Sequence, residues 1–130
     1  MWGNLQRLYD TVRLSLKLRT EKHKLISSNI ANVDTPGYRR KDLPFERIMQ
    51  SYLSNDKALK VTKPKHFSTR GRSIEDMLYI QPETLGTPNN VSLEEEMVSL
   101  TENQLLYETT LQALAKELER LKEIITEGGR

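Results

Sequence analysis

Apolar residues recur every three or four positions in the first part of the chain, residues 1–32. This spacing is typical of one face of an α-helix, and only Arg19 interrupts it. Further leucines, among them Leu14 and Leu18, lie away from this face. A helix with apolar residues on two sides needs more than one neighbour, so we expect a long helix with two packing partners. We use the word seam for the positions spaced four and three residues apart, which here are Leu5, Tyr9, Val12, Leu16, His23, Ile26 and Ile30.

The last part of the chain, residues 91–130, repeats this spacing more strictly. Ser92 followed by Glu95 predicts a capping box, in which each side chain satisfies a free amide at the start of a helix. The two glycines after residue 127 predict its end. A helix from residue 93 to about residue 126 is roughly 50 Å long at 1.5 Å per residue, so it requires a partner of similar length. Its seam comprises Leu93, Met97, Leu100, Gln104, Tyr107, Leu111, Leu114, Leu118, Leu121 and Ile125.

The part between them, residues 33–90, has a different character. Pro36 fixes its own backbone, and Gly37 after it can take the positive φ of a type II turn, so the first helix should end near Asn32. Apolar residues between Pro44 and Leu53 predict one short amphipathic helix. Residues 54–90 are polar and basic, and we expect them to be mobile in the free protein because they bury too little surface to offset their ordering entropy. A short hairpin or strand is predicted around residues 77–81.

These patterns predict a mainly α protein of one structural unit, in which the long N- and C-terminal helices pair as an antiparallel coiled-coil hairpin around an irregular, partly disordered middle segment. The charges agree with this pairing. Residues 1–32 hold six basic and two acidic residues, whereas residues 91–130 hold four basic and nine acidic residues. Opposite net charges favour pairing of the two ends with each other.

The residue types point away from catalysis. The chain has no cysteine, its two histidines are isolated in the sequence, and no Ser, His and Asp set or Gly-rich phosphate loop is present. The run Glu94–Glu96 lacks the further oxygen donors of a cation site, so we interpret it as a solvated helix start. We therefore predict no enzyme activity, no cofactor, no metal and no small-molecule substrate.

Nucleic-acid binding is a second class to weigh, because the isoelectric point is about 8.9 and Arg39, Arg40 and Lys41 form a basic cluster. The acidic C-terminal helix would oppose a polyanion, and no nucleic-acid motif accompanies the cluster. We therefore interpret the cluster as a solvated loop. A third class, a soluble coiled-coil adaptor or regulator, fits the seams as well as a structural subunit does, and the polar Gln104 suits either interpretation.

The N-terminal segment carries charges every few residues and lacks an uninterrupted apolar stretch, so no conventional secretory signal is expected. No run of about 18 apolar residues occurs, so no membrane-spanning helix is expected either. If the protein leaves the cytoplasm, another export route must carry it.

Residues 28–38 read Ser-Asn-Ile-Ala-Asn-Val-Asp-Thr-Pro-Gly-Tyr, which resembles the signature of the flagellar rod, hook and hook-associated axial proteins. Residues 95–98 and 102–107 resemble the closing helix of the same family. The short length and the sequence Glu-Asn-Gln-Leu-Leu-Tyr most resemble those of a proximal rod protein. The rod protein FlgC is the second candidate, because its closing helix usually contains more Ser and Ala than this one. The signature residues are Asn29, Ile30, Ala31, Asn32, Asp34, Thr35, Pro36, Gly37 and Tyr38.

The resemblance implies a structural subunit of the proximal rod of the bacterial flagellar basal body, which assembles through its terminal helices into a helical tube that transmits torque. It implies export by the flagellar type III apparatus and assembly in the periplasm. The implied partners are copies of the chain itself, other rod proteins such as FlgC, the basal-body adaptor FliE and the export apparatus. The seams of the two long helices would then be assembly surfaces.

Overall fold

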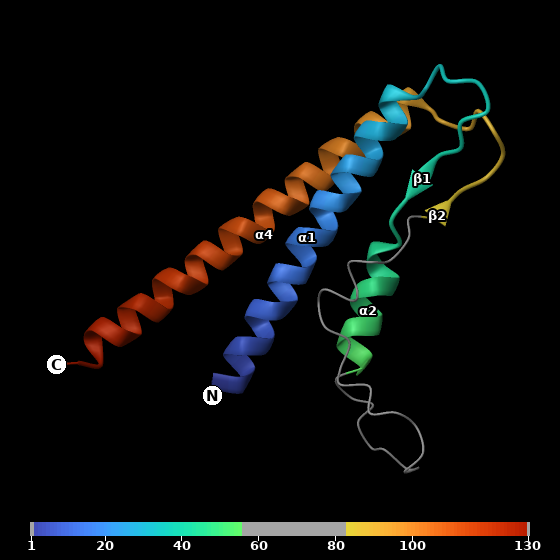
Figure 1. Cartoon of the computed structure of the whole chain (residues 1–130). Coiled ribbons are helices and arrows are strands. Elements are labelled where there is room, and N and C mark those ends of the chain that lie inside the picture. Colours follow the sequence, from blue (N-terminus) through green and yellow to red (C-terminus); the bar gives the residue numbers. More distant parts are fainter. Residues whose placement is uncertain (1, 56–82, 130) are drawn as a thin grey trace, which may run out of the picture.

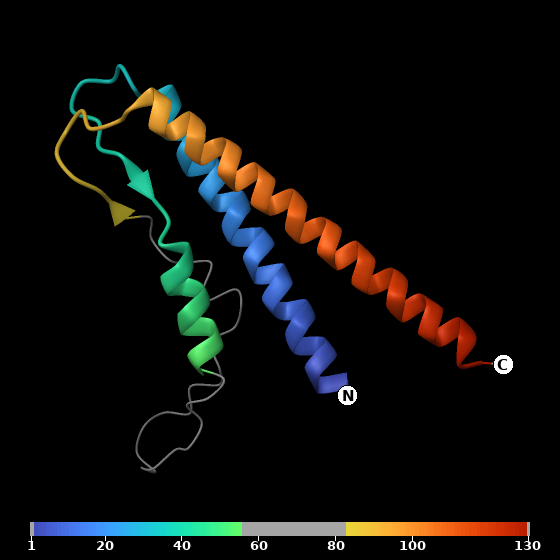
Figure 2. The same ribbon diagram turned by 180° about the vertical axis from the view of Figure 1, so that it is seen from behind.

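A computed structural model of the chain describes residues 2–55 and 83–129. Its elements are α1 (Trp2–Ala31), β1 (Lys41–Asp42), α2 (Phe45–Asn55), β2 (Glu83–Thr84) and α4 (Leu93–Glu127). The two long helices α1 and α4 run antiparallel and lie closest near the corner where α1 ends and α4 begins (Figure 1). They diverge towards the two termini, as the view from behind also shows (Figure 2). The predicted hairpin of long terminal helices is confirmed.

The start of α4 shows half of the predicted capping box. The hydroxyl oxygen of Ser92 accepts a hydrogen bond from the amide of Glu95 at 3.4 Å. The reciprocal bond from the side chain of Glu95 does not form, and the Ser92 hydroxyl donates to Glu94 at 3.2 Å instead. Negative charges in this first turn also complement the positive end of the helix dipole. The helix ends at Glu127, one residue before Gly128, where the sequence predicted its end.

The best-buried apolar core lies between α1 and α2, rather than between the two long helices. Leu14 and Leu18 of α1 are almost completely buried and pack against Leu43 and Ile48. Partly buried residues surround this cluster: Leu25, Phe45, Met49 and Tyr52. Three of the leucines that lie off the predicted seam of α1, Leu14, Leu18 and Leu25, therefore belong to this core, which explains why the helix has two apolar sides.

A two-stranded antiparallel pair joins the middle of the chain to the corner. Lys41 in β1 lies opposite Thr84 in β2, and the amide of Leu85 donates to the carbonyl of Arg40 at 2.8 Å. Arg47 of α2 forms an ion pair with Glu83. Composition places residues 83–90 in the mobile middle segment, but Leu85, Asn89 and Asn90 form hydrogen bonds with residues 37–40. The strand expected around residues 77–81 lies outside the described residues.

We predict that Leu14→Ala lowers the free energy of unfolding by about 2–5 kcal/mol, because it removes a fully buried side chain and leaves a cavity between α1 and α2. Urea unfolding followed by circular dichroism measures this change. The matched control is Leu105→Ala on α4, where the leucine is 63% exposed. This control should change stability by less than about 0.5 kcal/mol. Equal effects of the two substitutions would contradict a core between α1 and α2.

Candidate functional site

The corner between α1 and α4 begins with a turn built by the signature residues. The amide of Tyr38 donates to the carbonyl of Thr35 at 3.2 Å, which closes a β-turn with Pro36 and Gly37 at its centre. Gly37 has a φ of 76°, as the sequence predicted for a type II turn. The side chain of Asn32 donates to the carbonyl of Ser28 at 2.8 Å and thereby covers the last turn of α1.

Asn29 is the centre of this corner and is completely buried. Its amide nitrogen donates to the carbonyl of Lys41 at 2.8 Å and to a carboxylate oxygen of Glu96 at 3.1 Å. Its oxygen accepts from the amide of Lys41 at 3.0 Å and from the hydroxyl of Tyr38 at 3.0 Å. An asparagine side chain has two donors and two acceptor sites, so every one of them is used. Asn29 therefore joins α1, β1 and α4 through a single side chain.

Glu96 provides the charge that Asn29 contacts, and it is also completely buried. Its second carboxylate oxygen accepts a hydrogen bond from Nε of Arg40, so the two side chains form an ion pair. This bond raises the pKa of Arg40, while burial of the guanidinium acts in the opposite direction. A buried carboxylate is tolerated only where it is paired and hydrogen-bonded, and this one is. We call Asn29, Tyr38, Arg40 and Glu96 the corner clamp.

Two sequence interpretations need correction here. Glu96 is not part of a solvated helix start, although Glu94 and Glu95 are exposed as expected. Arg40 is not part of a solvated loop either, since its side chain is 24% exposed and pairs with Glu96. Its neighbours Arg39 and Lys41 are exposed. The reason in both cases is tertiary, because the partners come from segments 56 residues apart in the chain.

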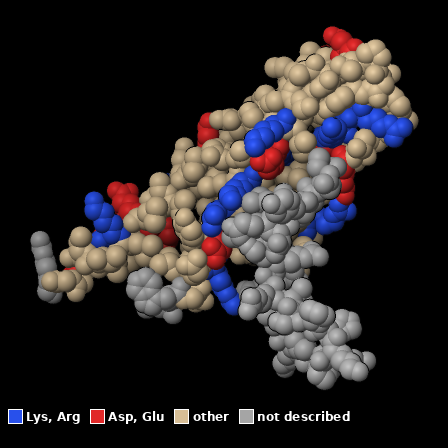
Figure 3. All heavy atoms as spheres, in the orientation of Figure 1, with Lys and Arg blue, Asp and Glu red and all other residues tan. Residues whose placement is uncertain are grey.

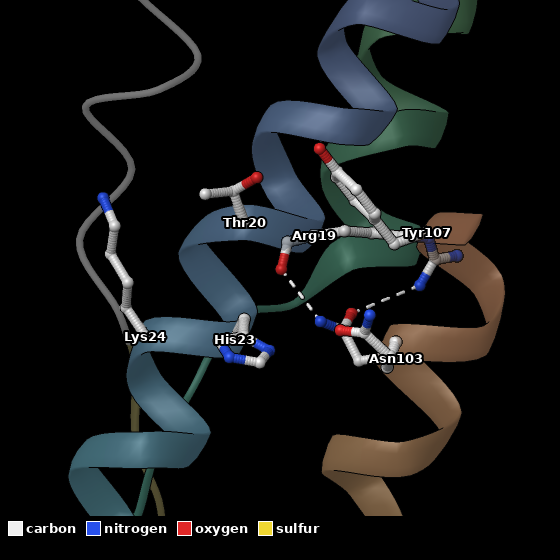
Figure 4. A pocket seen from close by; sticks show the side chains of 7 residues that line it. Arg19, Thr20, His23, Lys24, Asn103 and Tyr107 are labelled. Atoms are coloured by element: carbon white, nitrogen blue, oxygen red, sulfur yellow. Dashed lines mark hydrogen bonds between the residues drawn. The ribbon is translucent and has the colours of Figure 1, made fainter. Parts of the chain in front are cut away.

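A second polar contact crosses from α1 to α4 further along the hairpin. The side-chain nitrogen of Asn103 donates to the carbonyl of Arg19 at 2.9 Å, and Nη1 of Arg19 lies 3.5 Å from the side-chain oxygen of Asn103 (Figure 4). The Arg19 guanidinium also lies over the ring of Phe45 in α2, 4.2 Å from its centroid. Burial lowers the pKa of Arg19, and the charge of Glu46 opposes this shift. We call this contact the Arg19–Asn103 clamp. It explains why a charged residue interrupts the seam of α1.

Two asparagines before α4 complete the corner. Asn89 has a φ of 60°, its amide donates to the carbonyl of Tyr38 at 2.7 Å, and its side-chain oxygen accepts from the amide of Gly37 at 2.9 Å. Asn90 accepts from the amide of Arg40 at 3.0 Å. The sequence analysis missed both residues. The available signal was the Asn-Asn pair after Pro88, since asparagine is the residue other than glycine that most readily takes positive φ.

The outer surface of α4 carries most of the predicted seam. Leu100, Tyr107, Leu114 and Leu121 are half-buried on the side nearest α1. The remaining seam residues are exposed, and the apolar ones among them have exposed fractions of 40–73%. We call these six residues the apolar stripe: Leu93, Met97, Gln104, Leu111, Leu118 and Ile125.

The seam of α1 is distributed differently. Ile26 is buried, Leu5, Val12, Leu16 and Ile30 are half-buried, and Tyr9 is 52% exposed. Where the helices diverge, a groove of about 320 Å³ opens between them. Its lining is mostly apolar: Leu5, Gln6, Leu8, Tyr9, Leu114, Glu117, Leu118 and Leu121.

A second hollow of about 360 Å³ lies beside the Arg19–Asn103 clamp. His23 is exposed there, close to Asn103, while the Lys24 side chain points away from the hollow (Figure 4). Lys24 instead pairs with Glu21 at 2.7 Å. The hollow brings together no nucleophile, base and third orienting group among its lining residues. It therefore has no arrangement suited to covalent chemistry.

Charges on the described part of the chain are interleaved. Figure 3 shows Lys and Arg atoms beside Asp and Glu atoms on the face it presents, without one unbroken basic patch. Within residues 2–55 and 83–129, no three His, Asp or Glu side chains are placed to hold a metal ion. Over the same residues, no helix is both long enough and apolar enough to cross a membrane.

Comparison with known proteins gives a consistent result. The model of a family described as "Flagella basal body rod protein" matches residues 17–39, the stretch that holds Arg19, Asn29 and the turn. The chain is 30% identical over 128 residues to the flagellar basal body rod protein FlgB of Bacillus subtilis, covering 97% of this chain and 95% of that protein. It is 34% identical over 107 residues to FlgB of Aquifex aeolicus, covering 81% and 82%. It is 27% identical over 136 residues to FlgB of Salmonella typhimurium, covering 95% and 99%.

We predict that Asn29→Asp lowers the free energy of unfolding by about 3 kcal/mol or more at pH 7, because two donors are lost and a second carboxylate faces buried Glu96. The new carboxylate should have a folded-state pKa above its unfolded value, so part of the deficit should disappear as the pH falls from 7 towards 5. Urea unfolding at several pH values measures this. The control is Asn4→Asp at an exposed position of α1, and an equally small effect at both positions would contradict the clamp.

We predict that Gly37→Val costs about 1–2 kcal/mol of stability through backbone strain alone, since Gly37 has positive φ and an added Cβ would meet nothing within 4 Å. Gly37→Asn should keep most of the stability that Gly37→Val loses, because asparagine tolerates positive φ. Thermal unfolding distinguishes the two variants. If valine and asparagine have the same effect, strain at φ is not the cause.

Proposed function

Because this chain belongs to the FlgB family of flagellar basal body rod proteins, we propose that it assembles through its two long helices into the helical tube of the proximal rod and transmits torque there. The chain is a structural subunit of the flagellar basal-body rod and not an enzyme. The finer statements, tube assembly and torque, rest on the surface of α4.

The observation that carries the proposal is the exposed apolar stripe along α4. Five of its six residues are large and apolar, and from Met97 to Ile125 its positions recur every seven residues, once in each heptad. Large apolar side chains exposed in a row along a helix favour an interaction site. We propose that the stripe of one copy meets a different surface of the next copy. Contacts of this heterologous type build open helical assemblies rather than closed dimers.

The partners that we propose follow from the same surface. Copies of the chain, other rod proteins such as FlgC and the adaptor FliE would cover the stripe and the groove between α1 and α4. We propose that the protein reaches the periplasm through the flagellar type III apparatus and is incorporated there at the base of the rod. The interleaved charges at the corner do not favour nucleic acid, because a polyanion would meet carboxylates as well as Lys and Arg.

We predict that Leu111→Glu abolishes motility in a strain that lacks the native gene, because a charge in the centre of the stripe cannot be buried against a neighbouring subunit. Leu111 is 40% exposed in the single chain, so the variant should remain folded by circular dichroism. Swimming in soft agar and recovery of the variant in purified basal bodies measure the effect.

Thr109→Glu, at an exposed position of α4 outside the stripe, is the matched control and should swim normally. A motile Leu111→Glu strain would contradict assembly through the stripe. The competing hypothesis, a soluble coiled-coil adaptor, predicts a discrete helical dimer of the purified protein by sedimentation and normal basal bodies without it.

A further inference from the structure

The helix α4 presents the less apolar of two possible faces to α1. Three positions that contact or border α1 are Glu96, Asn103 and Glu117, and Thr110, half-buried, lies at the same seven-residue spacing. The stripe positions Met97, Gln104, Leu111 and Leu118 lie one residue further along the helix and are exposed. The half-buried apolar positions, from Leu100 to Leu121, border both faces. Apolar burial alone would turn the stripe towards α1 and the polar positions towards water.

We propose that the corner clamp and the Arg19–Asn103 clamp fix the rotation of α4 about its own axis, and thereby keep the apolar stripe available for neighbouring chains. The first part concerns the single chain only. The second part rests on the function proposed above, in which neighbouring chains cover the stripe.

The clamps can hold this rotation because Glu96 and Asn103 are the buried polar side chains of α4, and both bond to groups outside α4. Adjacent residues of an α-helix are separated by about 100° about the helix axis. Turning α4 until Met97 takes the place of Glu96 would therefore carry the Glu96 carboxylate away from Asn29 and Arg40. The buried amide of Asn29 would then lose one of its two acceptors, and the half-buried guanidinium of Arg40 would lose the carboxylate of Glu96, which is costly.

The second clamp opposes the same rotation. Asn103 lies seven residues after Glu96, two helical turns along the same side of α4. Only 4% of its surface is exposed. Turning α4 would withdraw its side chain from the carbonyl of Arg19. In coiled coils a single polar residue at a seam position sets the register at some cost in stability, and here two such residues act together.

The test replaces both α4 clamp residues by apolar ones of similar size, Glu96→Met with Asn103→Leu. The chain has no native cysteine, so a single Leu111→Cys substitution reports on one position of the stripe by its rate of reaction with a maleimide. We expect this rate to fall by about tenfold when the clamps are removed, because the stripe turns towards α1. A Thr110→Cys probe, on the polar row that includes Glu96 and Asn103, should react faster in the Glu96→Met, Asn103→Leu variant than in the unmodified chain.

An unchanged rate for Leu111→Cys in a folded double variant would overturn the proposal. If circular dichroism shows that the double variant is unfolded, the single variant Asn103→Leu decides. It keeps the corner clamp, and the Arg19 carbonyl retains its position within the helix. Because the proposal assigns part of the restraint to each clamp, we expect a smaller slowing of Leu111→Cys labelling in this variant, and an unchanged rate would overturn the role of the Arg19–Asn103 clamp.

The matched control is Glu102→Met with Thr109→Leu, which makes the same kind of change seven residues apart at exposed positions on neither face. This control should leave the labelling rate unchanged. Equal slowing would attribute the effect to added apolar surface and overturn the proposal. All of these measurements use the isolated chain, so failure of the rod function would appear in the motility of Leu111→Glu and not in the labelling rates.

Discussion

The structure depends on the burial of one carboxylate. Glu96 has no exposed surface, so its charge must be compensated within the protein, and only Arg40 and Asn29 contact it. These partners come from the residue just before β1 and from the end of α1. The requirement to pair one side chain therefore determines where α1 stops, how the turn returns the chain, and where α4 starts. The hydrogen bonds of Asn89 and Asn90 to residues 37–40 then hold the returning segment in that position.

The polar contacts and the apolar contacts of this chain have separate tasks. Apolar packing joins α1 to α2 through Leu14 and Leu18, whereas the two buried residues of α4, Glu96 and Asn103, are polar and bond to α1. An apolar interface between the long helices would have consumed the surface that a subunit of an assembly needs. A polar one is directional, so it specifies geometry while it leaves leucines on the outside.

The sequence was sufficient to predict the helices, but not the short strands β1 and β2 or the partners of each helix. Spacing of apolar residues predicted both long helices and the short α2, and the Pro36-Gly37 pair predicted the turn and its positive φ, because these signals are local. The same spacing could not predict that Leu14 packs against α2, because apolar periodicity indicates that a side is buried but not which element covers it. Glu96 was misjudged for a related reason, because a glutamate in the first turn of a helix has a satisfactory local explanation in the helix dipole. Only the fold brings Arg40 to it. Arg19 interrupts the apolar seam in the sequence, and its role depends on Phe45 of α2, which packs against its guanidinium only in the folded chain.

The distance along the chain between Asn29 and Glu96, 67 residues, has a consequence for the order in which the protein folds. Contacts between α1 and α2 close a short loop and are entropically inexpensive, so they should form early. The contact between Asn29 and Glu96 closes a longer loop of the chain. Until α4 arrives, Asn29 can bond to Lys41 and Tyr38 but not to its carboxylate, and Arg40 stays hydrated. Docking of α4 should therefore follow the packing of α1 against α2, and until it docks the acidic helix lacks its partners at the corner.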